Sequence, residues 1–550
     1  MLSDNKMMMK QKTIFQEVRT VLNVKVLMIL ITYHLSLITS FAQDIVPVRG
    51  DCMPGLKEAT TTSSKAIRRL PAVNRNWDSN RIYRQPVILV EFSDFAFSME
   101  KPRETYDSIF NHPGYNQRDG AGCVADYFRD QSNGLFNLQF DVYGPVKVNH
   151  LANPYTNPTS DTKNYGYSVF KDAAQKLVDS LEVDFSPYDW DGNGRVNQVL
   201  YIYAGFTGNQ GESKTYGKSY GYIWPNTSTH TTVTDKKGTK ISAYSCSGEL
   251  WLNFNAYGIG TICHEFTHSL GLPDIYPTTS NGYASVADEW DLMDGGNFTN
   301  WGWCPCNMTA LEKMLLGWLT PEELDEPVTI KDMKPLSEGG KAYMVKHTDN
   351  EYLLLENRQF IGWDKGIPGR GLVIYHVDYD ATEWIGNRVN NNAKHFRFDL
   401  VHADNRDYND WEDLIKEKGF GTYVETPRLH NRHLSTSAYP WAEDANSNNT
   451  LTDESTPAAT MYNTNTDGSK LLGKSITNIT MSSDGLVSFD FMGGNTSVGI
   501  SDACTQATDG IREVYDLQGR RVTADSRASK ANSLLIVREK NGQVKKIFSR

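Results

Sequence analysis

The chain has 550 residues, with 55 Lys and Arg against 66 Asp and Glu and a formal net charge of −11. At about 150 residues per domain, this length predicts three or four folding units. Hydrophobic residues make up 39% and charged residues 22%, which argues against a disordered chain and against an integral membrane protein. The acidic balance argues against a nucleic-acid binder, because such a protein needs a basic face to neutralise phosphates.

The N-terminus predicts export from the cell. Five basic residues precede an apolar run at residues 26–38, and Ser40-Phe41-Ala42 places small residues before a cleavage point. This order is typical of a secretory signal peptide, here residues 1–42. The alternative is a membrane anchor, but the apolar run is shorter than the ~20 residues that a span requires. We expect a secreted or cell-surface protein with a leader or pro-segment at residues 43–85.

The pattern of apolar and turn residues predicts α+β organisation followed by β structure. The predicted elements are a strand at 87–92, a helix at 124–130, a strand at 135–142, a helix at 168–181 with Ser168 as N-cap, a strand at 198–204, helices at 253–270 and 308–319, and strands at 351–356 and 371–377. Residues 442–469 are polar and predict a loop or linker. The expected domains are 86–320, a β-rich domain at 321–495 and a small C-terminal β module at 505–550.

The seven cysteines make an odd number and form no CxxC pair, so they indicate neither a structural zinc site nor a thioredoxin-type motif. In an exported protein we expect some disulfide pairing, with at least one thiol left over. Cys304 and Cys306 are predicted to be disulfide partners rather than metal ligands.

The segment from His264 to Asp274 (HEFTHSLGLPD) carries the chemistry. Residues four apart lie on one helix face, so His264 and His268 can present both imidazoles to one tetrahedral metal. Glu265 stands beside the first ligand, where a carboxylate can take a proton from water. Gly271 allows the chain to leave the helix and to bring Asp274 round as a third ligand. Three protein ligands leave one position open, which is the catalytic arrangement of zinc.

A second, independent feature is a methionine, Met293, which lies 19 residues after Asp274. The segment Trp290-Asp291-Leu292-Met293-Asp294-Gly295 places Met293 in a predicted tight turn, and a Met-turn beneath the metal is the other mark of metzincins. A competing third ligand is Glu289, which lies 21 residues after His268, near the spacing of thermolysin-like enzymes. Gly271 and the Met-turn favour Asp274.

These motifs resemble the M6 family of secreted bacterial metallopeptidases, of the immune inhibitor A type. The resemblance extends to 87–94 (VILVEFSD), 127–134 (YFRDQSNG), 301–319, 352–359 (YLLLENRQ) and 366–378, and covers roughly residues 85–490. It implies a metzincin-like catalytic domain built from a mixed sheet and an active-site helix. It also implies that His264, His268 and Asp274 bind zinc, that Glu265 is the general base, and that proteins or peptides are the substrates.

Two further segments are assigned. Asp189, Asp191, Asn193, Arg195 and Asn197 have the alternating oxygens of a calcium loop, with Arg195 contributing through its backbone. The twelfth position is Leu200 rather than Glu, so an EF-hand is excluded. M6 enzymes are generally calcium-stabilised, which supports a calcium site; the alternative is an Asx-rich turn.

The tail from residue 514 onward resembles the C-terminal sorting domain of the type IX secretion system. This resemblance implies cell-surface attachment; a plain β appendage is the alternative.

The sequence therefore predicts a secreted zinc endopeptidase. The alternative from another class is a surface adhesin or glycan-binding protein built on an inactive peptidase scaffold. The intact Glu265 favours the enzyme, since an inactive scaffold has no need of a base beside the ligands.

Overall fold

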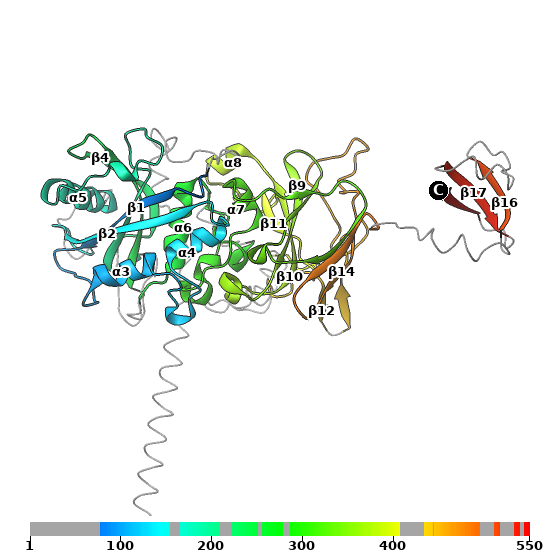
Figure 1. Cartoon of the computed structure of the whole chain (residues 1–550), viewed down its shortest axis with the longest axis horizontal. Coiled ribbons are helices and arrows are strands. Elements are labelled where there is room, and N and C mark those ends of the chain that lie inside the picture. The colour runs from blue at the N-terminus through cyan, green and yellow to red at the C-terminus, as the bar shows by residue number, and fades with distance from the viewer. Residues whose placement is uncertain are drawn as a thin grey trace, which may run out of the picture.

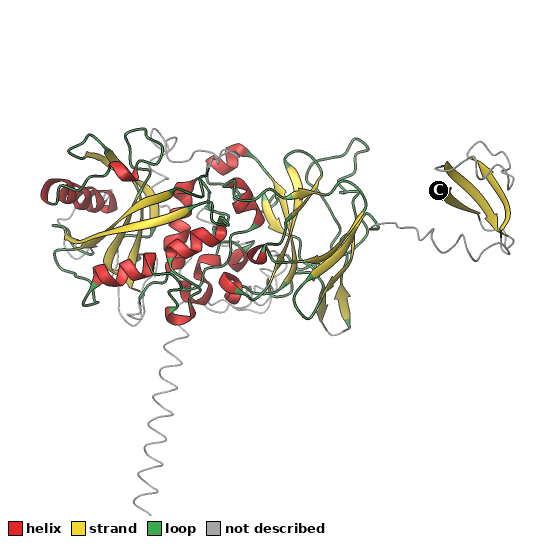
Figure 2. Ribbon diagram, viewed as in Figure 1, coloured by secondary structure: helices red, strands yellow, loops and turns green. Residues whose placement is uncertain are grey.

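The computed structural model describes residues 77–153, 165–208, 222–250, 256–278, 286–407, 434–443 and 445–494, together with the backbone of three strands after residue 510. The predicted signal peptide and most of the predicted leader lie outside these residues. Figure 1 shows two main groups of strands, joined by a region rich in helices, and Figure 2 shows that strands dominate the second group.

A five-stranded mixed sheet, in the order β2-β1-β3-β5-β4, forms the first half. Four strands are parallel, while the edge strand β4 runs antiparallel to β5. The strands are β1 (Ile82–Glu91), β2 (Asn137–Lys147), β3 (Val199–Phe206), β4 (Asn226–Thr234) and β5 (Lys240–Leu250). The predicted mixed sheet is present. The domain boundary predicted between residues 85 and 86 falls inside β1.

Helices cover both faces of this sheet. Successive side chains of a strand point to opposite faces, and in the central strands the side chains on both faces are apolar and need to be covered. Ile88 and Val90 of β1 pack in one cluster with α5, whereas Val87 and Leu89 pack in another with the remaining helices. The helices of the first half are α3 (Pro102–Asn111), α4 (Val124–Gln131), α5 (Tyr165–Ser180), α6 (Ile259–Leu270) and α7 (Ala310–Leu315).

Helix α6 is central because it carries the HExxH motif. A Cβ at Gly260 would lie 1.8 Å from the main-chain oxygen of Asn297, so only glycine permits this close approach. The helix ends at Gly271, whose φ of 111° is left-handed, as the sequence predicted. It begins at Ile259, six residues later than predicted.

Other helix ends also differ from the prediction. Ser168 lies inside α5 rather than at its N-cap, because the helix already begins at Tyr165. Helix α7 is shorter than predicted. Thr309 caps its start, accepting a hydrogen bond from the Glu312 N–H in a capping box, and Gly317, with a φ of 74°, follows its end.

The second half contains a five-stranded sheet, β11-β10-β9-β8-β6, and a three-stranded sheet, β14-β15-β7. Its elements are β6 (Glu322–Glu323), β7 (Val328–Met333), β8 (Tyr343–Lys346), β9 (Glu351–Arg358), β10 (Gly371–Asp378), α8 (Ala381–Ile385), β11 (Phe398–Leu400), β12 (Trp441–Glu443), β13 (Asn446–Asn448), β14 (Ile476–Met481) and β15 (Val487–Phe491). The predicted strands at 351–356 and 371–377 are confirmed as parts of β9 and β10.

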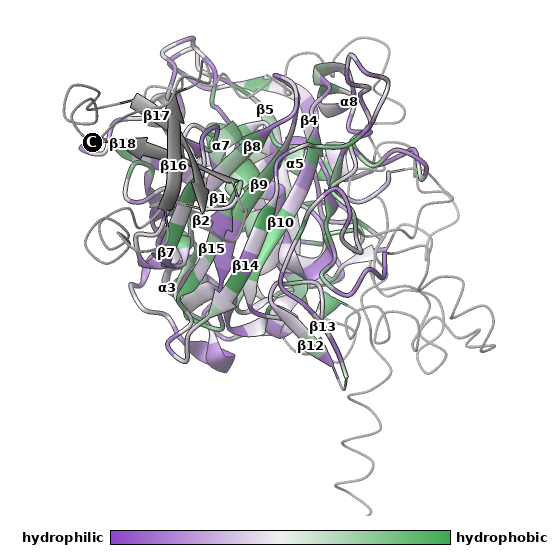
Figure 3. Ribbon diagram, turned by 90° about the vertical axis from the view of Figure 1, so that its right-hand side faces the viewer, coloured by the Kyte–Doolittle hydropathy of each residue, from purple (hydrophilic) through white to green (hydrophobic). Residues whose placement is uncertain are grey.

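Side chains of the larger sheet are buried on both of its faces, and the central strands β9 and β10 each carry a run of hydrophobic residues, coloured green in Figure 3. Leu353 and Leu355 face the smaller sheet, whereas Tyr352 and Leu354 join the cluster that contains α6 and Met293. One hydrophobic core therefore crosses the predicted boundary at residue 320, and the second half supports the region that carries the motif.

The prediction of a loop is confirmed for most of residues 442–469, because beyond the short strands β12 and β13 the described part of the segment holds only turns, bends and isolated bridges. The segment is packed against the sheets, however, and is not a linker. Leu451, Ala459 and Met461 are buried in the core between the two sheets of the second half, and β12 pairs with β13 as a hairpin. The polar composition hid this role, because a few apolar side chains in a long turn-rich segment have no regular spacing.

At the C-terminus, β16 (Ile511–Asp516), β17 (Ser533–Glu539) and β18 (Val544–Ser549) form an antiparallel sheet, as predicted for a β module.

The cysteines within the described residues are Cys123, Cys246, Cys263, Cys304 and Cys306, and each is a buried free thiol. The predicted pairing of Cys304 and Cys306 is therefore wrong. Cys304 instead approaches the main-chain oxygen of Trp363 at 3.4 Å, while the Cys306 carbonyl accepts a hydrogen bond from the Tyr127 hydroxyl. Both side chains serve as small core residues. No helix in the described part of the chain has the length and apolar character needed to cross a membrane.

Arg358 of β9 ties the two halves together in the interior. It pairs with Glu356 at 2.9 Å and Asp364 at 2.7 Å, and it donates to the main-chain oxygens of Trp290 and Asn307. We expect Arg358→Met to lower the free energy of unfolding by about 3–5 kcal/mol, because it leaves buried carboxylates without their counter-charge.

Urea denaturation of the purified chain measures this loss. Arg84→Met is the matched control, since Arg84 also pairs with a carboxylate, that of Asp141, but its side chain is 47% exposed. The control should lose no more than about 1 kcal/mol. Equal losses in the two variants would contradict the assignment.

Candidate metal centre

Three of the predicted site residues converge at the end of α6. His264 and His268 project from the helix, and the turn at Gly271 brings Asp274 back to them. The Asp274 Oδ1 atom lies 3.2 Å from His264 Nε2 and 3.0 Å from His268 Nε2, and all three side chains are buried. Across the described residues this is the one group of His, Cys, Asp or Glu side chains suited to a metal ion. Glu289, the competing third ligand, is not part of it.

Main-chain carbonyls fix both imidazole rings. His264 Nδ1 lies 2.8 Å from the oxygen of Leu292, and His268 Nδ1 lies 2.8 Å from the oxygen of Leu272. Because a carbonyl oxygen only accepts hydrogen bonds, each Nδ1 carries the proton and each Nε2 turns its lone pair toward Asp274. Three electron-rich atoms then face one another, an arrangement that a bound cation stabilises.

The donor set fits zinc. Two imidazole nitrogens and one carboxylate oxygen are common zinc ligands, and tetrahedral coordination at the usual bond lengths separates ligand atoms by about 3.4 Å. The measured separations of 3.2 and 3.0 Å are close to this value. The chain thus offers three ligands and leaves a fourth coordination position.

The protonation states also suit a metal. Burial lowers the pKa of His268, which favours the neutral imidazole that a metal requires. Burial acts to raise the pKa of the Asp274 carboxyl, but the adjacent His268 and His264 outweigh it, and the pKa lies well below its usual value. An ionised carboxylate at Asp274 and a neutral imidazole at His268 are the forms in which these groups bind a metal.

Glu265 is buried beside these residues. Its Oε2 lies 3.0 Å from the Thr227 hydroxyl of the edge strand β4, which also lies 2.6 Å from the Glu265 main-chain oxygen. Glu265 Oε1 has no hydrogen-bond partner among the described residues. Burial, as the largest cause, raises the pKa of Glu265 to about 8. The Thr227 hydroxyl thus shares its one proton between the carboxylate and the main-chain oxygen of Glu265. Sequence reasoning missed this residue because nothing in a Thr-rich strand marks one hydroxyl.

The predicted Met-turn lies directly against the ligands. Besides the contact of Leu292 with His264, the Met293 oxygen accepts a hydrogen bond of 2.9 Å from the Ile275 N–H, next to Asp274. The Met293 side chain is fully buried in the main core. This segment therefore supports both the first histidine and the loop that carries Asp274.

A residue from the second half also reaches the cluster. Asn387, which follows α8, accepts a hydrogen bond from the Asp274 N–H at 2.7 Å and donates one to Asp274 Oδ2 at 2.6 Å. No pattern in the sequence predicts this contact, because 113 residues separate the two side chains and many asparagines surround Asn387.

The predicted calcium loop lies between α5 and β3. Asp189 accepts hydrogen bonds from the N–H groups of Asn193 at 3.0 Å and Gly194 at 2.7 Å, while Asn197 donates to Asp191 at 3.2 Å. Asn193 accepts from the Arg195 N–H. These internal bonds are those of an Asx-rich turn, and calcium binding at this loop stays a prediction.

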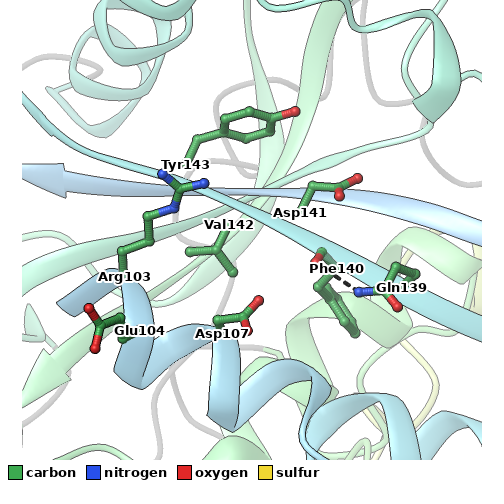
Figure 4. Close-up of a pocket in the computed structure, with 8 residues that line it drawn as sticks. All are labelled: Arg103, Glu104, Asp107, Gln139, Phe140, Asp141, Val142 and Tyr143. Carbon is green, nitrogen blue, oxygen red and sulfur yellow. Dashed lines mark hydrogen bonds between the residues drawn. The ribbon is translucent and has the colours of Figure 1, made fainter. Parts of the chain in front are cut away.

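A separate pocket of about 600 Å³ opens between α3 and β2 (Figure 4). Its lining is polar and mixed in charge, and comprises Arg103, Glu104, Asp107, Gln139, Phe140, Asp141, Val142 and Tyr143. It contains none of the predicted site residues, so the chemistry of the HExxH motif lies elsewhere.

Comparisons with known proteins point to the same segment. Residues 72–314 match the model of the immune inhibitor A peptidase M6 catalytic domain. Immune inhibitor A from Bacillus thuringiensis subsp. alesti is 26% identical over 287 residues, covering 44% of this chain and 41% of the relative. The pre-pro-metalloprotease PrtV of Vibrio cholerae serotype O1 is 21% identical over 247 residues, covering 40% and 26%.

The chain thus spans less than half the length of each of these relatives. The matched region includes the first sheet, α6 and the turn at Met293, and ends before the second half begins. These matches support an immune inhibitor A-like M6 peptidase domain at residues 72–314.

Proposed function

We propose that this chain is an exported zinc-dependent endopeptidase, with His264, His268 and Asp274 as zinc ligands and Glu265 as the general base. The observation that carries the proposal is the convergence of two Nε2 atoms and one carboxylate oxygen beside a buried, oriented glutamate. The similarity to PrtV, which is named a pre-pro-metalloprotease, points in the same direction. The main-chain contacts of Leu292 with His264 and of Met293 with Ile275 support a metzincin-like arrangement.

The chemistry that zinc supplies when bound is polarisation of the scissile carbonyl and activation of a water molecule. Glu265 accepts the proton of the attacking water on Oε1, while Thr227 holds Oε2. It then delivers that proton to the amine nitrogen as the peptide C–N bond breaks. The products are a free carboxylate and a free amine, without a covalent acyl-enzyme.

The remaining assignments extend the proposal to the whole chain. Residues 1–42 direct export, and residues 43–85 act as a leader or pro-segment. The loop of Asp189, Asp191, Asn193, Arg195 and Asn197 binds a structural calcium ion. The C-terminal β module sorts the protein through the type IX system or attaches it to the cell surface. Proteins outside the cell are the substrates.

Glu265→Gln tests the catalytic role. We expect kcat/KM for casein hydrolysis to fall by about 10²–10⁴-fold, because the proton acceptor is removed while the shape is kept. Zinc content should stay unchanged. A chelator should abolish the wild-type activity, and added zinc should restore it.

An unchanged rate in Glu265→Gln would contradict the proposed base. If the zinc-loaded wild type is inactive, limited trypsin cleavage near Arg69 tests for a latent zymogen. Inactivity after that cleavage would favour the adhesin.

Asp274→Ala and Glu289→Ala together test the ligand set. We expect Asp274→Ala to lose most of its zinc after dialysis, because only two protein ligands remain, whereas Glu289→Ala should retain about one zinc per chain. Metal analysis by atomic emission measures both. The reverse pattern would make Glu289 the third ligand and Asp274 a structural residue.

Thr227→Val tests the orientation of the base. The loss of one hydrogen bond should lower kcat by about 3- to 10-fold, with little change in KM, because Thr227 acts through Glu265. Thr227→Ser keeps the hydroxyl and should retain most of the rate in a progress-curve assay. A rise in KM at constant kcat would instead assign Thr227 to substrate binding.

A further inference from the structure

Asp274 is held at two points by one side chain from outside the matched peptidase region. The Asn387 amide accepts from the Asp274 N–H at 2.7 Å and donates to Asp274 Oδ2 at 2.6 Å. Both residues are buried, with Asp274 fully covered and Asn387 6% exposed. Because Oδ2 is bound to the amide, Oδ1 is the oxygen that faces the two imidazoles.

The segment that carries Asn387 is itself well fixed. Asp380 caps the start of α8 by accepting from the N–H groups of Thr382 and Glu383, and Trp384 at its end is buried in the main core. Asn387 follows with a φ of 56°, a left-handed conformation that asparagine tolerates better than most residues. The amide therefore reaches Asp274 from a rigid support.

A second pair of contacts fastens the other end of the same loop. The Thr278 N–H donates to Asn391 Oδ1 at 2.7 Å, and the Thr278 hydroxyl donates to the main-chain oxygen of Asn387 at 2.5 Å. The ligand loop between Asp274 and Thr278 is thus clamped along its length by residues 387–391. These bonds come from outside the matched residues 72–314.

We propose that Asn387 is a positioning residue for the metal centre: its amide selects the oxygen of Asp274 that binds the metal and holds it at the histidines. The second half of the chain then completes the metal site rather than merely following it. This inference rests on the proposed function, since it takes Asp274 as a metal ligand. A primary amide suits the role because it offers both a donor and an acceptor to one residue.

The test measures metal affinity rather than hydrolysis. We expect Asn387→Ala to weaken zinc binding by about 10- to 100-fold, the usual effect of removing a residue that orients a metal ligand. Competition with a chromophoric chelator gives the affinity of the full chain. The visible absorption of the Co²⁺-substituted protein reports the ligand geometry and should change in the variant.

Asn390→Ala is the matched control. Asn390 lies in the same segment and is also buried, but its amide donates to the Phe398 oxygen and accepts from the Arg397 N–H, away from Asp274. It should lower the thermal midpoint of the metal-free protein without altering zinc affinity or the Co²⁺ spectrum. Asn387→Asp is a second variant that tests the inference if Asn387→Ala does not fold. It keeps the size and the acceptor but removes the donor to Asp274 Oδ2, so it should weaken zinc binding.

Three outcomes would overturn the inference. In the first, the Asn387 variants bind zinc as tightly as the wild type, with the same Co²⁺ spectrum, while Glu265 and Asp274 behave as proposed. In the second, Asn390→Ala weakens zinc binding as much as Asn387→Ala, which would assign the effect to folding. In the third, the wild type binds no zinc, and the proposed function falls with it. If the wild type binds zinc but does not hydrolyse casein, only the proposed peptidase activity is contradicted. The expected loss of zinc affinity in Asn387→Ala can still be measured.

Discussion

A buried carboxylate between two buried imidazoles is the constraint on which the surrounding structure depends. Burying the charge of Asp274 is unfavourable unless it is compensated, and the three facing atoms provide the electron density that a cation needs. The cost of removing this group from water is offset by hydrogen bonds to its other atoms. The polar contacts described at these candidate ligands come from the main chain at Leu272 and Leu292 and from the Asn387 amide.

Four separate parts of the chain meet at this point. Helix α6 presents the histidines, the turn at Met293 holds His264 and Ile275, strand β4 orients Glu265, and the segment after α8 binds Asp274. Each contact uses one or two hydrogen bonds to set the direction of a side chain. The arrangement resembles the division of labour common in metal sites, where the ligands supply affinity and their partners supply orientation.

The hydrophobic core explains why the second half can reach the ligands. One face of the β8–β10 sheet packs in the same cluster as α6, and Arg358 bonds to the main chain at Trp290 and Asn307. The M6 match ends at residue 314, yet the packing does not. A fragment that ends near residue 320 would expose this apolar face and lose the support of Asn387.

The sequence by itself determined the helix that ends at Gly271, the order of the histidines, the nearby Asp274 and the mixed α and β character, because these follow from local spacing and turn chemistry. It misplaced the start of β1 and the N-cap of α5, and it missed that Cys304 and Cys306 are free thiols and that residues 442–469 pack in the core. These features depend on neighbours distant in sequence. Only the tertiary structure identified Thr227 and Asn387. A hydrogen bond between residues 113 apart leaves no periodic signal, since it forms only when folding brings the loop after α6 next to the segment after α8.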